Sequence, residues 1–188
     1  MRLSPDGRRL FIALVDADTA HTTIQVWDTR SRRRVRSVRV TGWADVDISP
    51  DGRLLALGYR TGGAQLWSTA TWRPVGRNFA ADAGGVSAQI SRDDRALATT
   101  TETGVVRLWD IKTGQAIGTA LPGVPSRPAA AYFTGRGHLI ASYDTGRAYL
   151  WDIRPGSLAR QACEVAGRRL TRTEWDEFLP GRDYNPAC

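Results

Sequence analysis

The chain has 188 residues, of which 41% are hydrophobic and 24% are charged, a balance typical of a globular protein. No apolar run approaches the roughly 18 residues that a membrane-spanning helix needs, and the N-terminus lacks the apolar stretch of a secretion signal. We therefore expect a cytoplasmic protein with no membrane partner. The formal net charge is +7, and every basic residue except Lys112 is an arginine. Codon usage in a GC-rich genome would explain this bias without a nucleic-acid function.

A tryptophan recurs along the chain at steps of 40, 42 and 42 residues, and in three of its four copies an aspartate follows it. The four pairs are Trp27-Asp28, Trp67-Ser68, Trp109-Asp110 and Trp151-Asp152. Upstream of each tryptophan lies a second marker, a turn-forming tetrapeptide at residues 4–7, 49–52, 91–94 and 134–137. Self-similarity at this period predicts an array of supersecondary units that stack on one another.

The first unit begins within a strand at residues 1–3 and is longer than the other units, so we expect residues 16–22 to form a bulging polar loop. Arginines crowd the segment that follows its tryptophan, at Arg30, Arg32, Arg33, Arg34, Arg36 and Arg39. If this segment is an outer strand, Arg34 and Arg36 point to the same face, because side chains alternate along a strand.

The second and third units each read as four short strands with Gly and Asp at the bends. The second unit extends over residues 46–79, and the strands of the third are expected at residues 86–90, 96–100, 105–109 and 115–121. Alternating apolar and polar residues between turn-forming residues predict an antiparallel meander.

The order of these strands, with a Ser-Pro-Asp-Gly turn, a Thr-Gly turn and a third strand ending in Leu-Trp-Asp, resembles the WD40 repeat of β-propellers over residues 1–153. The resemblance implies an all-β fold, a partial WD40 β-propeller of about four four-stranded antiparallel blades with a short α-helical C-terminal tail. It also implies that the repeated residues Trp27, Trp67, Trp109 and Trp151 are structural and pack between blades. In many WD40 repeats a Gly-His pair and an Asp form buried hydrogen bonds with this tryptophan. Here Thr61, Thr103 and Thr145 occupy the Asp position, so we expect this polar network to be absent.

Four units are too few for the roughly seven blades with which such propellers usually close. An open arc exposes two apolar blade faces and their strand edges. Three interpretations stay open. The chain is the C-terminal piece of a longer protein, or it closes a ring by pairing with itself or a paralogue, or it is a degraded remnant or an unusually small ring.

Residues 154–188 form a separate tail with two predicted helices. The first covers residues 158–166, with Ser157 as its N-cap and Gly167 after its end. Residues 171–174 form a capping box for the second, whose Trp175, Phe178 and Leu179 share a face that we expect to dock on the last blade. The tail resembles the ends of WD-repeat arrays in actinobacterial signalling proteins, including those with STAND-type ATPase modules. If the tail folds back, Cys163 and Cys188 could form a disulfide that closes a loop of about 25 residues, or stay reduced in the cytosol.

No nucleophile elbow, phosphate-binding loop or metal-binding motif is present, so we expect no enzyme activity, no cofactor and no metal site.

The leading hypothesis is a non-catalytic scaffold that binds a protein partner, and self-association that completes the propeller is a second partner hypothesis. The resemblance implies partner-binding residues on the turns before the third strands and on the loops between blades, at Trp43, Tyr59, Arg60, Thr101, Glu102, Tyr143 and Asp144. For each of them, capping of its own turn is the alternative interpretation. Two further alternatives are a regulatory end of a bacterial signalling NTPase or kinase, and nucleic-acid binding by the Arg30–Arg39 segment. A charged edge that prevents aggregation explains that segment better than phosphate contacts do.

Overall fold

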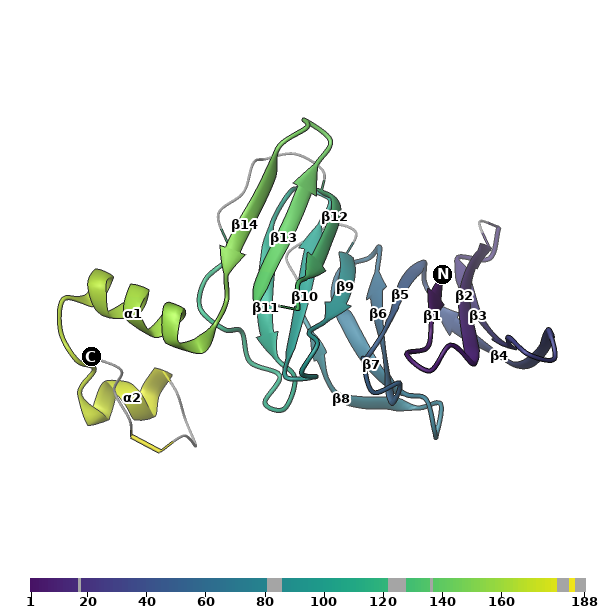
Figure 1. The fold of residues 1–188 in the computed structure, drawn as a ribbon, viewed down its shortest axis with the longest axis horizontal. Coiled ribbons are helices and arrows are strands. Elements are labelled where there is room, and N and C mark those ends of the chain that lie inside the picture. Colours follow the sequence, from purple (N-terminus) through teal and green to yellow (C-terminus); the bar gives the residue numbers. More distant parts are fainter. Residues whose placement is uncertain (17, 81–85, 122–127, 136, 179–182, 185–188) are drawn as a thin grey trace.

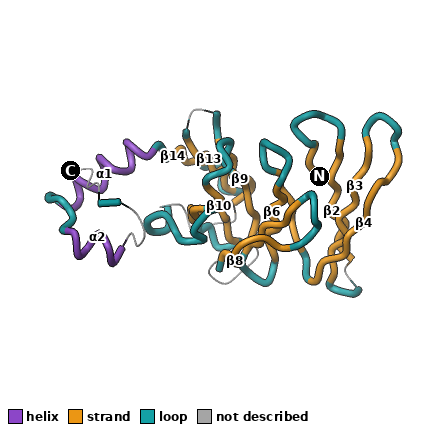
Figure 2. Tube along the Cα trace, turned by 90° about the horizontal axis from the view of Figure 1, so that it is seen from below, coloured by secondary structure: helices purple, strands orange, loops and turns teal. Residues whose placement is uncertain are grey.

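The computed structural model describes residues 1–188 except 17, 81–85, 122–127, 136, 179–182 and 185–188. The described strands form four antiparallel sheets that stand side by side in a row, and two helices follow them (Figure 1). We call these sheets blades 1 to 4 in chain order. Blade 1 and the helices lie at opposite ends of the row (Figure 2). The predicted partial propeller with a short helical tail is thereby confirmed.

Each strand pairs with its neighbours in the sequence. Blade 1 contains β1 (Arg2–Leu3), β2 (Arg9–Asp16), β3 (His21–Asp28) and β4 (Arg33–Thr41). Blade 2 contains β5 (Ala44–Ile48), β6 (Leu54–Tyr59), β7 (Ala64–Ser68) and β8 (Pro74–Phe79). Blade 3 contains β9 (Val86–Ile90), β10 (Ala96–Thr101) and β11 (Val106–Asp110). Blade 4 contains β12 (Pro128–Phe133), β13 (His138–Tyr143) and β14 (Ala148–Asp152).

The expectation of four strands in every blade therefore holds for blades 1 and 2 only. Residues 115–121 of blade 3 form just two isolated bridges to β11, Trp109 with Ala116 and Val106 with Leu121. Gly118 lies between these bridges with a φ of +69°, which interrupts the extended backbone that a continuous strand requires.

The repeated tetrapeptide upstream of the first three tryptophans is a hydrogen-bonded turn. In blade 1 the Ser4 hydroxyl donates to Asp6 at 2.7 Å and accepts from the backbone N–H of Arg9 at 2.8 Å. Ser49 and Ser91 make the same pair of hydrogen bonds in blades 2 and 3. The Ser4 hydroxyl and the Arg8 N–H hold the pKa of Asp6 below its usual range, so this carboxylate is charged at neutral pH.

Three apolar clusters join the blades, one at each junction, and each cluster takes residues from both flanking sheets. Between blades 2 and 3, for example, Leu66 and Phe79 pack with Leu97 and Trp109, and the rings of Phe79 and Trp109 meet edge to face at 6.0 Å. Every internal blade thus buries one face against the preceding blade and the other face against the following blade. The core is the sum of these junctions.

Asp47 in β5 connects the inner strands of three blades. Its Oδ1 accepts from Nε of Arg2 in β1 at 2.8 Å, and its Oδ2 accepts from the backbone N–H of Ile90 in β9 at 3.0 Å. The carboxylate is almost completely buried, whereas the Arg2 side chain keeps 31% of its surface exposed. Nothing in the spacing of the repeats indicated this connection.

The long hairpin of blade 1 differs from the prediction of a bulging loop at residues 16–22. Strands β2 and β3 instead extend to the pair Asp16 and His21. Thr22 is fully buried, its hydroxyl donates to the carbonyl of Gly42 at 2.9 Å, and it accepts from the N–H of Ala44 at 2.9 Å. These bonds to the next blade hold the polar segment in the strand.

The prediction that Arg34 and Arg36 share a face is wrong. A β-bulge interrupts the pairing of β4 with β3, where Trp27 lies opposite Arg34 and Val26 lies opposite Arg36. Because Trp27 and Val26 face opposite sides of the sheet, the two arginines do too. The extra residue of the bulge is Val35.

The expected absence of polar contacts to the repeated tryptophans holds only in part. In blade 3 the Nε1 of Trp109 donates to the Thr99 hydroxyl at 2.8 Å, and both residues are buried. In blade 2 the Nε1 of Trp67 is buried without a hydrogen-bond partner, since Leu57 occupies the position that corresponds to Thr99. In blade 3, Thr99 on the neighbouring strand β10 thus replaces the usual hydrogen-bond partner of the repeated tryptophan.

The tail contains α1 (Pro155–Ala166) and α2 (Arg172–Phe178). Helix α1 begins earlier than predicted, because Pro155 at its first position has a preset φ and needs no N–H partner. Ser157 is therefore inside the helix, and its hydroxyl donates to Asp152 at 2.7 Å instead of capping. Gly167 ends α1 with a φ of +63°, as predicted. No helix in the described part of the chain could span a bilayer.

The predicted capping box of α2 is confirmed. The Thr171 N–H donates to Glu174 at 2.8 Å, and the Glu174 N–H donates to the Thr171 hydroxyl at 3.3 Å. The Trp175 ring packs edge to face on Tyr184 at 5.7 Å. The docking of the tail on blade 4 stays a prediction, and Leu179 and the side chain of Phe178 lie outside the described residues.

Candidate functional site

The loops at one edge of the blades bring three of the predicted partner-binding residues together. The Arg60 guanidinium lies over the Trp43 ring at 4.9 Å and within 3.5 Å of a Glu102 carboxylate oxygen. Arg60 and Glu102 are exposed, and Trp43 is half-buried with a buried Nε1 that has no hydrogen-bond partner. These three residues come from successive loops between and within blades, and we call them the loop cluster.

Three other predicted residues point into the protein. Thr101 is buried, and its hydroxyl accepts from the N–H of Val105 in its own turn at 3.2 Å. Tyr143 is buried, and its hydroxyl donates to the carbonyl of Gly104 in the neighbouring blade at 3.3 Å. Tyr59 is half-buried against the cluster between blades 1 and 2. Burial raises the pKa of both tyrosines.

Asp144 is exposed at the tip of the blade 4 hairpin. It lies at the position that corresponds to Arg60 and Glu102 in the preceding blades, because β6, β10 and β13 all end one residue earlier. The sequence pattern therefore found the exposed positions of this edge. It did not separate them from the adjacent strand-end positions, where burial depends on the neighbouring blade.

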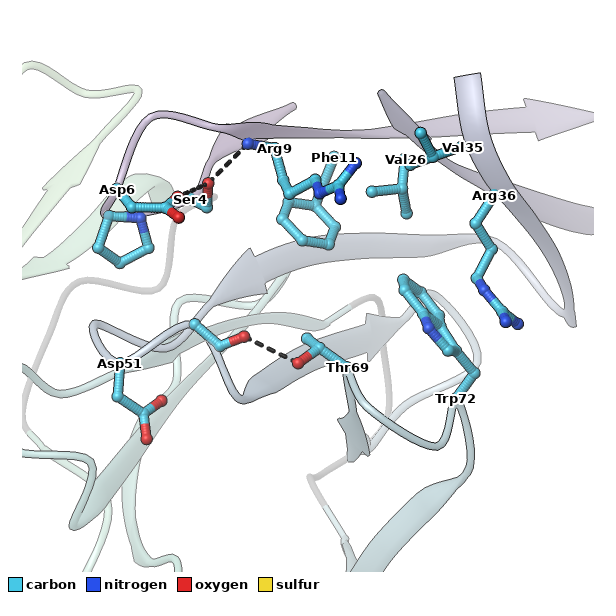
Figure 3. Close-up of a pocket in the computed structure, with 12 residues that line it drawn as sticks. Ser4, Asp6, Arg9, Phe11, Val26, Val35, Arg36, Asp51, Thr69 and Trp72 are labelled. Atoms are coloured by element: carbon cyan, nitrogen blue, oxygen red, sulfur yellow. Dashed lines mark hydrogen bonds between the residues drawn. The ribbon is translucent and has the colours of Figure 1, made fainter. Parts of the chain in front are cut away.

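A groove lies between blades 1 and 2, at the edge formed by the Ser-Pro-Asp-Gly turns (Figure 3). Its volume is about 530 Å³. Phe11, Val26 and Val35 line it from blade 1, and Trp72 lines it from the turn between β7 and β8. In Figure 3, Asp6 and Asp51 lie at one end of the groove, and Arg36 and Trp72 lie at the other end.

The groove exists because two polar residues replace an apolar pair. Between blades 2 and 3, Leu54 and Ile111 pack on the junction cluster. The matching positions between blades 1 and 2 hold Arg9 and Thr69, as the repeated turn hydrogen bonds show. Arg9 turns toward Asp28, with 3.2 Å between Nη1 and Oδ2, and the Thr69 hydroxyl donates to the carbonyl of Gly52 at 2.8 Å. Neither side chain fills the junction.

The outer face of blade 4 exposes positions that are buried in the internal blades. Leu66 and Leu108, each next to its repeated tryptophan, are 3% exposed because the following blade covers them, whereas Leu150 is 62% exposed. Leu150 pairs across strands with Ile140, and Ile140 pairs with Tyr132, so the three side chains form one exposed apolar row. We call this row the C-face.

The outer face of blade 1 is the counterpart at the other end of the row. Leu10 is half-buried there, although the matching residues Leu55, Leu97 and Leu139 are fully buried against the preceding blade. Leu3 is exposed, and Ile12 and Trp27 are half-buried. We call these four residues the N-face.

The four repeated tryptophans occupy the same position in their blades but differ in burial. Trp109 is buried between blades 2 and 3, and Trp67 and Trp151 are half-buried against the clusters that precede their own blades. Trp27 lies on the N-face, and its Nε1 donates to Gln25 at 3.0 Å.

Among the described residues no group of three His, Cys, Asp or Glu side chains could hold a metal ion. Cys163 lies in α1, and Cys188 lies outside the described residues, so their pairing stays a prediction.

Three features escaped the sequence reasoning: Trp72, Asp47 and the identity of the residues that form the C-face, although an exposed apolar end face was expected of an open arc. Alignment of the repeats offers a signal for two of them. Trp72 stands where the third repeat has Gly114, and Ile140 stands where the second and third repeats have the small residues Ala56 and Ala98.

No protein-family model matches the chain, and neither does any curated protein sequence. Solved structures are similar to it. A structure of U3-55K is 22% identical with a TM-score of 0.69, over 81% of this chain and 47% of that one. A crystal structure of the WD40 repeats of RRP9 is 21% identical with a TM-score of 0.70, over the same shares of the two chains. At this identity the likeness shows the fold, which is that of WD40 β-propeller blades. The chain spans about half the length of these structures.

Proposed function

We propose that this protein is a non-catalytic interaction scaffold that completes a propeller by pairing its two end faces with those of a second copy. In this assembly the C-face of each copy packs on the N-face of the other. Two copies joined head to tail form a closed ring with two identical junctions. WD40 folds in general act as platforms for protein binding, which supports the role of an interaction scaffold.

The exposure of Leu150 is the observation that carries the proposal. Leu66 and Leu108 occupy the same position, and in both cases the next blade reduces exposure to 3%. Full burial of a leucine side chain stabilises a protein by about 1.5–3 kcal/mol. A row of three exposed apolar side chains on a sheet face marks an interaction site better than scattered residues do.

The N-face supplies the complementary surface. Between blades 2 and 3, Leu66 packs in one cluster with Leu97 and Trp109 of the following blade. Leu97 and Trp109 occupy the positions that Leu10 and Trp27 occupy in blade 1. The two end faces thus carry the two halves of a junction that the chain already builds three times.

Light scattering on a size-exclusion column, across a range of protein concentrations, tests this proposal. We expect a dimer for the unmodified chain and a monomer for Leu150→Asp, because a carboxylate cannot be buried unpaired at the junction. Val75→Asp is the matched control, since Val75 is a similarly exposed apolar residue on the outer strand of blade 2. A monomer of the unmodified chain at every concentration would contradict the pairing.

Light scattering together with NMR separates the pairing from docking of the tail. Helix α1 leaves from the end of β14 on the side of the C-face (Figure 1), yet Leu150 remains 62% exposed. A monomer in which the Leu150 methyl groups contact tail residues in NMR spectra would support the predicted docking of the tail instead.

The loop cluster is a second candidate surface for a protein partner. Trp43 and Arg60 are residue types that dominate binding energies at interfaces, and here they are stacked on each other. For a partner captured by this surface, Arg60→Ala should weaken binding at least tenfold, a loss of about 1.4 kcal/mol or more. Arg53→Ala, an exposed arginine at the opposite edge of blade 2, is the control.

A regulatory role beside a bacterial signalling NTPase or kinase is a finer proposal that rests on the resemblance of the tail, and a cytoplasmic location is one that rests on the sequence patterns of the apolar runs and the N-terminus. Nucleic-acid binding by residues 30–39 is a weaker one, because the bulge at Val35 divides these arginines between two faces. In addition, Arg39 pairs with Asp16 at 3.5 Å. Binding to a DNA oligonucleotide without a steep salt dependence would reject it.

A further inference from the structure

The groove between blades 1 and 2 combines an apolar floor with charged ends. Phe11 and Val26 are buried and form its floor, and Val35 is an exposed part of its wall. In Figure 3 the floor lies between the two aspartates at one end and Arg36 with Trp72 at the other end. None of these groups belongs to the loop cluster or to either end face.

Trp72 adopts a backbone conformation that bulky residues rarely adopt. Its φ is +58°, and its N–H donates to the carbonyl of Ser68 at 2.8 Å, which closes the turn. The matching residues in blades 1 and 3 are Arg32 and Gly114, with φ values of +56° and +71°, so the left-handed conformation belongs to this turn in all three blades.

Arg36 reaches the groove because of the bulge in β4. The bulge places Val35 and Arg36 together opposite Val26, on the side of the sheet that faces blade 2. The Arg36 guanidinium lies 5.3 Å from the centroid of the Trp72 ring. Arg36 is exposed, and among the described residues no carboxylate pairs with it. Stacking on the indole orients the planar group and leaves its N–H donors available for a carboxylate.

We propose that this groove binds an extended peptide segment in which a large apolar side chain lies beside an acidic residue. The apolar side chain packs on Phe11, Val26 and Trp72, and the carboxylate accepts hydrogen bonds from Arg36. The overall charge of +7 favours the approach of such an acidic segment.

The chemistry of the groove favours a peptide over a nucleic acid. Asp6 and Asp51 line the end away from Arg36, so they repel a phosphate backbone that runs along the whole groove more than a single carboxylate held at Arg36. Val26 and Val35 provide an aliphatic wall, whereas single-stranded nucleic acids stack their bases on successive aromatic side chains. Arg34, the nearest other arginine of β4, faces the opposite side of the sheet.

This inference does not depend on the pairing of the end faces. The groove is built from two adjacent blades of one chain, so a monomer and a ring contain it equally. The mass of the protein tests the pairing, and peptide binding tests the groove, so failure of one leaves the other intact.

The experiment uses the full chain and three capped hexapeptides: Gly-Gly-Leu-Glu-Gly-Gly, its Leu-Gln counterpart and its Ala-Glu counterpart. Binding is followed by NMR through the indole N–H resonance of Trp72, which Trp72→Phe identifies by its loss. We expect the Leu-Glu peptide to shift this resonance saturably. The Leu-Gln and Ala-Glu peptides should bind about tenfold more weakly, since each lacks one of the two anchoring groups.

Two variants with the same change of charge complete the test. Arg36→Gln should remove the preference for Leu-Glu over Leu-Gln, and Arg34→Gln, on the opposite face of the same strand, should retain it. Equal binding of all three peptides, or equal effects of the two variants, would overturn the proposal. A shift of the Trp72 resonance by an oligo-dT strand but not by the Leu-Glu peptide would overturn it in favour of nucleic acid.

Discussion

Replacement of Asp47 tests how the blades hold together, because this carboxylate joins three inner strands. In Asp47→Ala the N–H of Ile90 loses its acceptor in a buried setting, which costs about 1–3 kcal/mol. The ion pair with Arg2 adds only about 1 kcal/mol, since the Arg2 side chain is 31% exposed and can be hydrated again. We therefore expect a total loss of about 2–4 kcal/mol in the free energy of unfolding.

Two further variants separate these contributions. Asp47→Asn keeps an acceptor for Ile90 and removes only the charge, so it should cost about 1 kcal/mol. Arg2→Ala should cost a similar amount, because it breaks the same ion pair from the other side. For a chain of this length a loss of 3 kcal/mol lowers the Tm by roughly 6–12 °C.

Urea unfolding followed by tryptophan fluorescence measures the three variants under identical conditions. The order of stability should be unmodified chain, then Asp47→Asn and Arg2→Ala together, then Asp47→Ala. Equal stability of Asp47→Ala and Asp47→Asn would refute the reasoning, since the hydrogen bond between blades 2 and 3 would then contribute nothing.

Three further predictions concern single contacts. Trp109→Phe should cost about 1–2 kcal/mol more than Trp67→Phe in urea unfolding, because only the Trp109 indole donates a buried hydrogen bond. Arg168 and Thr171 lower the pKa of Glu174 to about 2 from a usual 4.5. The stabilisation of α2 by this carboxylate is therefore complete above pH 4.5 and is lost as the pH falls from there toward 2, which an NMR titration of the carboxyl carbon measures. If Cys163 and Cys188 form a disulfide, the intact mass measured without reductant is lower by two hydrogens, and Cys188→Ser abolishes the difference.

Each of these predictions has a clear contrary outcome. Equal costs of the two tryptophan substitutions would mean that the hydrogen bond to Thr99 does not stabilise blade 3. A Glu174 carboxyl that titrates at its usual pKa would contradict the capping box and the contact with Arg168. Two thiols that react fully with an alkylating agent in the freshly isolated, unreduced protein would show that the cysteines are not paired.

Most of the fold could be predicted from local patterns. Strands such as β9, β10 and β11 follow from alternating or β-branched residues between turn-forming ones, and the turns follow from Ser, Asp and Gly at fixed positions. The capping box of α2 was equally local, since both of its hydrogen bonds join residues three apart. Some local patterns failed for local reasons, as Gly118 interrupts the strand expected at residues 115–121, and one failed because of a distant partner. Thr22 stays in β3 because of its bonds to Gly42 and Ala44.

The candidate sites were less predictable, because exposure depends on the neighbouring blade. Tyr59, Thr101 and Tyr143 end corresponding strands, yet Tyr59 is half-buried whereas Thr101 and Tyr143 are buried. The groove depends on Arg9 and Thr69 standing where the next junction has Leu54 and Ile111, a comparison that requires the packing partners to be known.

The sequence by itself determined the repeat, the blade architecture and the openness of the arc, because strand periodicity and turn chemistry act over a few residues. The tertiary structure alone decided which faces are covered, which arginines share a side and where a groove remains. Those properties arise from contacts between side chains about 40 residues apart, such as Leu66 with Trp109 or Arg36 with Trp72. A repeat in the sequence predicts that such contacts recur at every junction between blades. Only the packed blades show at which junction a contact is missing.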